Sequence, residues 1–333
     1  MATDVDGSTA QSPRSRHSRL AQAAALAYYH EDKKMEAIAR DLDVSRSTVS
    51  RLLAFAREAG IVEIRVARPE LRATAIERDL HETYDVDATV VTVPEDTGPE
   101  ERHARTAAYA AELLHEVVSH DTVLAIAWGT MVNAISYRLK PKTVTNCKLV
   151  QLNGIGHGTG IGVHYAHAMM NRYGEAFRAN VQQLPAPIFF DTERLKRLSH
   201  SEKAFSHVRQ LGEKADVALF SIGTVSTGVP SSPHLYGSFL TEEDFAQLAQ
   251  DGAVGDIAAT FFDKQGESGG IRMNNRSTGP DLEKLKSIAR RICVVSGSHK
   301  LEALDAALHG GHVGELIIDE VTARELLEAP NGA

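Results

Sequence analysis

Apolar positions recur with a helical period at the start of the chain. They fall three and four residues apart from about Ser18 to His30, from Lys34 to Leu42 and from Arg46 to Glu58, and Gly60 ends the pattern. This spacing predicts three short helices that form a compact head. Residues 1–16, rich in Ser, Thr, Asp and Gly, predict a disordered lead-in.

The period changes after Gly60. Residues 61–67 alternate apolar and polar, which predicts a strand, and Pro69 favours the start of a helix ending near Tyr84. Strand-like runs at 88–93, 122–129, 147–152, 216–223, 292–297 and 315–320 then alternate with helical patterns at 101–118, 131–139, 201–211, 300–308 and 322–327. Such alternation predicts an α/β fold with a mainly parallel sheet covered on both faces. We expect a head at 17–68, a linker helix at 69–87 and a body at 88–330.

Composition narrows the class of protein. The 333 residues, 43% hydrophobic and 24% charged, are typical of a globular protein of more than one domain. No apolar stretch approaches the roughly 18 residues of a membrane span, and the start lacks the apolar core of a signal peptide. We therefore expect a cytoplasmic protein without membrane contact. Cys147 and Cys293 lie in apolar runs, which predicts buried free thiols.

Charge is unevenly distributed along the chain. The net charge is −8, yet residues 14–68 carry 11 Lys and Arg against 7 Asp and Glu. A basic head on an acidic body fits nucleic-acid binding at one end of the molecule.

The segment MEAIARDLDVSRSTVSRLL, residues 35–53, has the spacing of a helix-turn-helix. Asp43 stands in the turn, where a left-handed residue is needed, and Ser45 suits the N-cap of the second helix. The positions expected to close a small core are Ile38, Leu42, Val44, Val49 and Leu52.

The second helix of this motif would expose its amino-terminal end, the part of a recognition helix that meets base edges and phosphates. The DNA-binding candidates are Ser45, Arg46, Ser47, Thr48, Ser50 and Arg51. The alternative is an ordinary solvated helix face. The complete turn pattern and the local positive charge favour operator DNA.

Head and body together resemble the SorC-type (SorC/DeoR) sugar-binding transcriptional regulators, from about residue 18 to about 328. The matching strings, in order, are GIVEIRV, TVLAIAWGT, VQLNG, QLPAPIFF, ADVALFSIG, GAVGDIAATFFDKQG, VVSGSHK and AALHGGHVGELIIDEVTARELL. The resemblance implies a winged-helix-like head and a Rossmann-like body similar to sugar-phosphate isomerases. It also implies a homo-oligomer, dimer or tetramer, on a pseudo-palindromic operator.

Loops after the strands are the first places to expect a ligand in an open parallel sheet. Gly129 and Thr130 could hold an anion, although a tight turn would also require the glycine. Lys300 would supply positive charge to a phosphate, against the alternative of an unpaired surface lysine. Ser296 and Ser298 replace glycines common in the family.

Asn153 and Gly154 open a glycine-rich loop that lacks the GxGxxG fingerprint, so the loop does not predict a dinucleotide site. Ile155 replaces a second glycine usual in the family. Either a mobile ligand loop or a flexible connection fits this stretch.

Oxygen ligands for sugar hydroxyls are expected from Asp256, with Asp263 behind it and Asn153 as a further candidate. Asp256 could instead cap a turn or form an ion pair. Arg178 is a further anion-binding candidate. His157, His164 and His167 lie near one another, but no carboxylate stands at a metal-motif spacing, so we expect no metal and no cofactor.

Three functions compete at this stage. The first is regulation of a sugar, polyol or nucleoside catabolic operon by a sugar or sugar-phosphate effector. The second is an isomerase- or deaminase-like enzyme with Asp256 as base and Lys300 as electrophile. The third is a constitutive DNA-binding scaffold. No His and carboxylate pair stands at a spacing that compels catalysis, so a regulator without enzymatic activity is expected.

Overall fold

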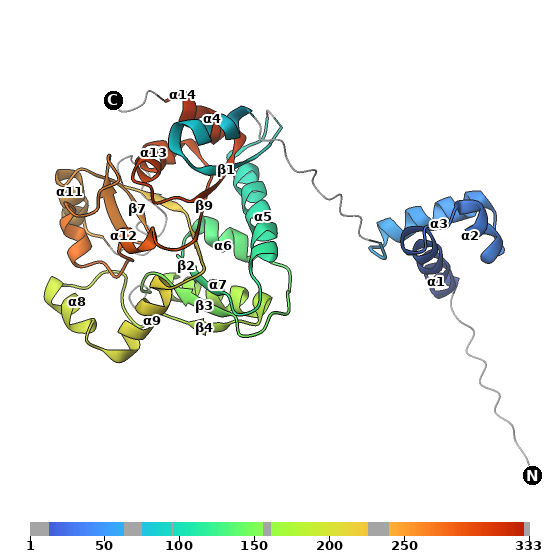
Figure 1. The fold of residues 1–333 in the computed structure, drawn as a ribbon, viewed down its shortest axis with the longest axis horizontal. Helices are drawn as coiled ribbons and strands as arrows, with labels where there is room; N and C mark the ends of the chain where they lie inside the picture. Colours follow the sequence, from blue (N-terminus) through green and yellow to red (C-terminus); the bar gives the residue numbers. More distant parts are fainter. Residues whose placement is uncertain (1–12, 63–74, 95, 156–160, 226–239, 330–333) are drawn as a thin grey trace, which may run out of the picture. The chain divides into compact units, whose positions relative to one another are not determined.

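The structure, a computed structural model, describes residues 13–62, 75–94, 96–155, 161–225 and 240–329. The chain divides into two compact units, residues 1–71 and 72–333 (Figure 1). We describe each unit by itself.

The first unit contains the three expected helices. Its elements are α1 (Pro13–Ala25), a π-helical turn η1 (Leu26–His30), α2 (Met35–Asp41) and α3 (Arg46–Glu58). Helix α1 begins at Pro13, so the disorder expected through residue 16 is wrong for its last residues; proline suits a first helical position. Most of the strand predicted at 61–67 lies outside the described residues.

The expected core of the first unit is confirmed. Ile38, Val49 and Leu52 are at most 1% exposed, and Leu42 and Val44 pack partly buried against them. Asp43 adopts a φ of 50°, the left-handed conformation that the turn between α2 and α3 requires. Small residues of α1, Ala21 and Ala24, let it approach α3 closely.

The second unit is built on a seven-stranded sheet in the order β1-β10-β9-β5-β2-β3-β4, with every pairing parallel. The strands are β1 (Asp87–Val91), β2 (Val123–Ile126), β3 (Lys148–Gln151), β4 (Asn180–Gln182), β5 (Val217–Phe220), β9 (Arg290–Val295) and β10 (Glu315–Asp319). The mainly parallel α/β fold is thereby confirmed.

Side-chain alternation buries both faces of this sheet. On β2, Leu124 and Ile126 belong to one apolar cluster, whereas Ala125 and Ala127 belong to the other. The first cluster is covered by α5 (Pro99–Val117), α6 (Thr130–Ser136) and α7 (Ile161–Phe177). The second is covered by α4 (Ala75–Tyr84), α9 (Lys203–Glu213), α12 (Leu282–Leu285), α13 (Leu301–His309) and α14 (Glu320–Glu328).

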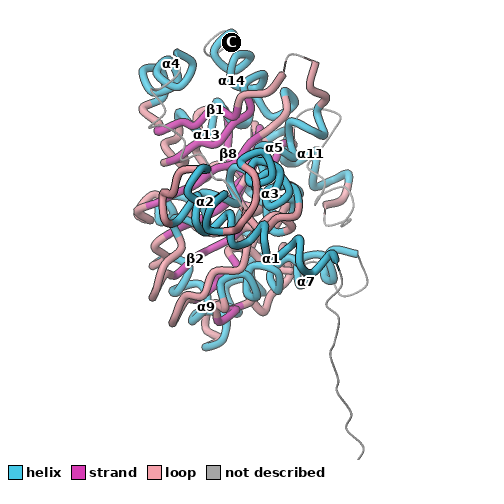
Figure 2. The backbone as a smooth tube through the Cα atoms, turned by 90° about the vertical axis from the view of Figure 1, so that its right-hand side faces the viewer, coloured by secondary structure: helices cyan, strands magenta, loops and turns pink. Residues whose placement is uncertain are grey.

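Helices α4 and α14 lie side by side at one end of this unit in both views (Figure 1, Figure 2). The remaining helices of the described residues are α8 (Glu193–Ser199), α11 (Glu242–Gln250) and the short turns η2 (Arg272–Asn275) and η3 (Ser298–Lys300). No helix of the described residues is long and apolar enough to cross a bilayer.

A second, three-stranded antiparallel sheet was not predicted. It consists of β6 (Ile222–Thr224), β7 (Ala253–Ile257) and β8 (Thr260–Asp263), in that order. The sequence of β7 contains Gly255, a poor strand former. A Cβ there would lie 2.6 Å from the Ala303 Cβ and 2.9 Å from the Gly223 oxygen, so close tertiary packing requires the glycine.

The order of the strands reverses direction at the centre of the large sheet. After β2 the chain adds β3 and β4 on one side, then returns with β5 on the other side. In open parallel sheets, a crevice forms beyond the carboxyl ends of the strands at such a switch point. Residues that follow β2 and β5 therefore flank the expected ligand position.

Two glycines at this edge differ in the room around them. A Cβ on Gly154 would lie 2.2 Å from the Pro187 oxygen and 2.5 Å from the Ala186 oxygen. A Cβ on Gly129 would meet no atom within 4 Å, and its φ of 173° is extended backbone open to any residue. Gly154 is therefore required by packing, while the tight turn that would require Gly129 is absent.

A buried histidine, His312, links the loop after α13 to the loop after β8. His312 is 1% exposed, and its Nε2 lies 2.7 Å from the Gly266 carbonyl oxygen. Burial lowers the pKa of the His312 ring below its usual range. Its Nδ1 has no hydrogen-bond partner among the described residues, so a second ring proton would be buried without an acceptor.

We predict that Gly154→Ala destabilises the protein by about 1–3 kcal/mol, because two backbone carbonyls must move. Gly129→Ala, the matched control, should cost less, about 1 kcal/mol at most, because it loses only the preference for glycine over alanine at the N-cap of α6. Denaturant unfolding of both variants measures the difference. Equal stability of the two would contradict the packing described for Gly154.

We also predict that stability falls as the pH drops through the usual histidine range. The unfolded chain then takes up a proton at His312 that the folded chain excludes, so the stability present above the unfolded pKa is lost below it. The loss attributable to His312 should reach about 1 kcal/mol between pH 7.5 and 5.5. Unfolding His312→Gln at both pH values checks this: the variant should show a flatter pH dependence than the parent protein.

Candidate effector site and DNA-binding helix

Lys300 lies at the carboxyl edge of the large sheet, in the loop that follows β9. Its Nζ donates to the Ile222 carbonyl at 2.7 Å and to the Ser221 hydroxyl at 3.4 Å, directly after β5. Burial lowers the pKa of Lys300, while Cys293 and Asp256 oppose that shift electrostatically. The structure therefore places a desolvated amine at the carboxyl edge of the sheet, beside the residues that follow β5.

Asp256 belongs to the same neighbourhood. It lies on β7 opposite Gly223, next to the Ile222 that Lys300 contacts, and is 6% exposed. Its Oδ2 accepts from the Ala259 N–H at 2.9 Å, within a turn where Ala258 and Ala259 have φ of 51° and 68°. The carboxylate thus stabilises the β7–β8 turn and also acts on Lys300.

Asp263 is separated from Asp256 by the length of the β7–β8 hairpin. It pairs with Ala253 at the far end, and its Oδ1 accepts from the N–H groups of Gln265 and Glu267. These bonds stabilise its own loop, so Asp263 does not join the group around Lys300.

Asn153 and Gly154 connect the loops after β2 and β3. The Trp128 ring donates from Nε1 to the Gly154 carbonyl at 2.9 Å, and the Trp128 N–H lies 3.5 Å from the Asn153 Oδ1. Asn153 is 3% exposed, and the Gly154 N–H donates to the Thr278 hydroxyl. Both residues lie at the predicted carboxyl edge of the sheet, where with Trp128 they form a packed wall.

Gly129 and Thr130 follow Trp128 at the same edge and are less tightly packed than Asn153 and Gly154. Thr130 is the first residue of α6 and is exposed, and Gly129 is half-buried. Arg178 does not join them: it follows α7 and precedes β4, at the amino-terminal edge of the sheet, where Asn180 pairs with Lys148. The expectation that Arg178 belongs with Lys300 is corrected by this placement.

Four further residues near the edge had no signal in the sequence that pointed to them. Arg102 Nη1 lies 3.3 Å from Asp319 Oδ1, and Thr322 accepts from the Gly297 N–H at 2.9 Å. His103 is half-buried; burial and the positive charges of Lys300 and Arg138 lower its pKa. Arg102 and Asp319 are 217 positions apart, so only folding brings them together.

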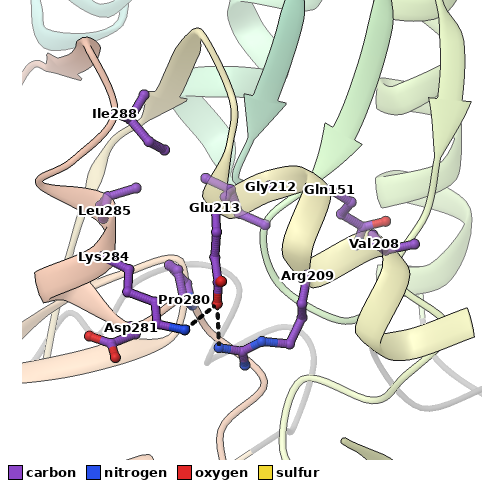
Figure 3. Close-up of a pocket in the computed structure, with 11 residues that line it drawn as sticks. Gln151, Val208, Arg209, Gly212, Glu213, Pro280, Asp281, Lys284, Leu285 and Ile288 are labelled. Atoms are coloured by element: carbon purple, nitrogen blue, oxygen red, sulfur yellow. Dashed lines mark hydrogen bonds and ion pairs between the residues drawn. The ribbon is translucent and has the colours of Figure 1, made fainter. Parts of the chain in front are cut away.

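Gln151 and Leu152 line a separate small pocket between α9 and α12 (Figure 3). Three of its charged groups form ion pairs: Glu213 Oε1 lies 3.0 Å from Lys284 Nζ and 3.7 Å from Arg209 Nη2. Gln151 Nε2 donates to the Asn153 carbonyl at 2.6 Å, which joins this wall to the loop after β3. None of the predicted effector residues lines it.

The amino-terminal end of α3 has the expected cap. Ser45 Oγ accepts from the Thr48 N–H at 3.1 Å and also lies 2.8 Å from Ser47 Oγ. Thr48 is half-buried, and Arg51 Nη2 donates to its hydroxyl at 3.4 Å. The residues of this helix end that are exposed are Ser45, Arg46, Ser47, Ser50 and Arg51.

Arg46 forms one ion pair on this surface. Its Nε lies 3.3 Å from Glu36 Oε1, and the two side chains are 69% and 59% exposed. A pair so exposed contributes little to stability, so the guanidinium can exchange partners with little cost.

Among the described residues, no three His, Cys, Asp or Glu side chains gather as they would around a metal ion. His167 accepts at Nδ1 from the Gln183 amide at 2.8 Å. His157, and the side chain of His164, lie outside what the structure describes.

Comparisons with known proteins agree with this architecture. The family model "Putative sugar-binding domain" matches residues 69–328. A deoxyribonucleoside regulator of Bacillus subtilis (strain 168) is 35% identical over 312 residues, 93% of this chain and 97% of that protein.

Two solved structures are similar as well. A domain of a possible sugar-binding transcriptional regulator from Arthrobacter aurescens TC1 has a TM-score of 0.72 and 37% identity, covering 78% of this chain and all of that one. The full-length sorbitol operon regulator SorC from Klebsiella pneumoniae has a TM-score of 0.79 over 93% of this chain and 98% of its own; at 23% identity it shows the fold. The chain therefore belongs to the SorC family of transcriptional regulators with a sugar-binding domain.

Proposed function

We propose that this protein is a DNA-binding regulator of a carbohydrate catabolic operon for a sugar, polyol or nucleoside. A sugar or sugar-phosphate effector, bound at the carboxyl edge of the large sheet, controls its operator binding. The desolvated Lys300 amine, held at this edge by the Ile222 carbonyl and within electrostatic range of Asp256, carries this proposal. We assign DNA binding to 17–68, the linking helix to 69–87, and effector binding and oligomerisation to 88–330.

The proposed effector contacts follow from the chemistry of the edge. An ammonium group has three donors, and two face Ser221 and Ile222, so one remains for a phosphate oxygen. A bound phosphate would offset the burial that lowers the Lys300 pKa. At the same edge Gly129 and Thr130 leave room, and the oxygens of Asp256 and Asn153 would accept from ligand hydroxyls.

The proposed DNA contact is the amino-terminal end of α3, in a helix-turn-helix formed with α2. Arg46 and Arg51 would contact guanine or phosphate, and Ser47 and Ser50 would contact phosphate. A homo-oligomer places two such helices on a pseudo-palindrome whose half-sites lie about one helical turn, or a multiple, apart. An effector that changes this spacing changes operator affinity, so binding at one site is read at the other. This role places the protein in the cytoplasm with the operator DNA.

An enzymatic role is the weaker alternative. Asp256, the candidate base, already accepts from the Ala259 N–H, and Lys300 already donates to β6. The Bacillus subtilis relative described above is by name a deoxyribonucleoside regulator. Turnover of a sugar phosphate by the purified protein would reverse this ranking.

We predict that a sugar phosphate stabilises the protein and that Lys300→Ala abolishes the effect. At about 100 times its Kd, a ligand adds about 2.7 kcal/mol to the free energy of unfolding. Thermal-shift screening of sugars, polyols and their phosphates measures this, and the emission of Trp128, the chain's one tryptophan, gives a second readout at the site.

Lys264→Ala is the matched control for this screen, because Lys264 is a surface lysine with a 58% exposed side chain beside Glu302. It should bind the effector as the parent protein does. A phosphate that stabilises the Lys300→Ala variant equally would move the anion site elsewhere. No stabilisation by any compound would favour the scaffold function.

We predict that Arg46→Ala and Arg51→Ala weaken binding to genomic DNA fragments selected for affinity to the protein. Each lost phosphate contact should lower the log–log salt slope by about 0.9, and each lost guanine contact should relax specificity by about 1–3 kcal/mol. Arg197→Ala in α8, with a 68% exposed side chain paired to Glu193, removes the same charge as a control. Equal losses in all three variants would indicate a nonspecific charge effect and contradict the assignment to α3.

A further inference from the structure

We propose that Thr322 is a positioning residue for the loop that carries Lys300, and that the Asp319–Arg102 pair holds Thr322 for this role. The proposal rests on the function proposed above, since it concerns the affinity of the same effector site. None of these three side chains needs to touch the effector.

The polarity of the contacts defines the role of the Thr322 hydroxyl. Its proton goes to Asp319 Oδ2 at 2.6 Å, because an ionised carboxylate only accepts. The oxygen then accepts from the Gly297 N–H at 2.9 Å. Asp319 Oδ1 also accepts the Thr322 N–H at 3.1 Å, so both side chains have one arrangement.

Burial makes the loss of any of these hydrogen bonds costly. Asp319 and Thr322 are 0% exposed, so no solvent replaces a lost partner. Arg102, on α5, offsets the charge of the Asp319 carboxylate across 3.3 Å, and its own side chain is only 11% exposed. Removing one member would leave a buried polar group without its partner.

The loop itself depends on Gly297 at its base. Gly297 has a φ of 114°, and its carbonyl accepts from the Lys300 N–H at 3.1 Å, which closes the turn. Its N–H is the group that Thr322 holds. Ser298 and His299 between them are exposed. Thr322 therefore orients the turn whose last residue is Lys300, and Lys300 Nζ reaches Ile222 from there.

A purely structural role explains only part of these contacts. As the N-cap of α14, Asp319 needs to accept the Thr322 N–H and nothing more. The hydrogen bond from Gly297 to the Thr322 hydroxyl joins a separate loop to that cap. Positioning therefore predicts a selective loss of effector affinity, beyond any loss of stability.

The test compares Thr322→Val, which keeps the shape but removes the hydroxyl, with Thr322→Ser, which keeps the hydroxyl. Thr106→Val is the matched control: Thr106 is also 0% exposed, and its hydroxyl donates to the Arg102 carbonyl within its own helix. The probes are the sugar phosphate that most stabilises the parent protein and inorganic phosphate. Binding of each probe to the full chain is measured by the change in Trp128 emission.

Thr322→Val should bind the sugar phosphate about tenfold more weakly, which corresponds to about 1.4 kcal/mol. Thr322→Ser and Thr106→Val should stay within about twofold of the parent protein, a difference of less than 1 kcal/mol. Unchanged affinity of Thr322→Val, or an equal loss in Thr106→Val, would overturn the proposal.

A second measurement does not need an effector. Amide hydrogen exchange in the segment 296–300 should be at least about tenfold faster in Thr322→Val, and unchanged in Thr106→Val. Unchanged exchange in that segment would overturn the positioning role. If the parent protein binds no sugar phosphate, the proposed function fails, while the exchange experiment still decides whether Thr322 holds the loop.

Discussion

Burial of both faces of the parallel sheet is the constraint on which the rest of the body depends. Apolar side chains alternate to opposite faces along β2, β3, β5, β9 and β10, and helices cover each face. Polar side chains on those strands would lie in one of two apolar clusters. Chemistry is therefore confined to the ends of the strands, and the reversal of strand order directs it to the carboxyl ends of β2 and β5.

The carboxyl edge combines rigid and open parts. Trp128, Asn153 and Gly154 form a wall of short contacts that leaves no room for an added methyl group at Gly154. Gly129 and Thr130 face open space nearby. Lys300 is held at the same edge of the sheet by hydrogen bonds to residues after β5, where its amine is partly desolvated.

The head has a small core that leaves one face of its third helix exposed. Its core is made of small and medium apolar residues of α1, α2 and α3, so most of the α3 surface remains outside the core. At the capped end of α3, Arg46 makes an exposed ion pair with Glu36 of α2, and Arg51 donates to Thr48 at 3.4 Å; such exposed contacts are weak. Such groups are available for a stronger partner, and the basic charge of this segment fits DNA.

The sequence by itself determined the main helices and strands and the functional class of this protein. Periodicity predicted α1, α2, α3 and the main strands of the body, because side-chain period reports directly on which residues are buried. The turn residue Asp43 and the cap Ser45 were predicted because their reasons are local. Lys300 and Gly129 were predicted at the right edge because parallel strands place their following loops together.

Only the tertiary structure decided the contacts between distant segments. Arg178 and Lys300 both follow regular elements, but the sheet direction puts them at opposite edges. Asp256 and Asp263 share one hairpin, yet its antiparallel pairing separates them. The pairing of β6 with β7, the Arg102–Asp319 ion pair and the Gly297–Thr322 hydrogen bond arise from residues far apart in the chain. Local patterns carry no information on such pairs, since their energies appear only when the packed core brings the partners into contact.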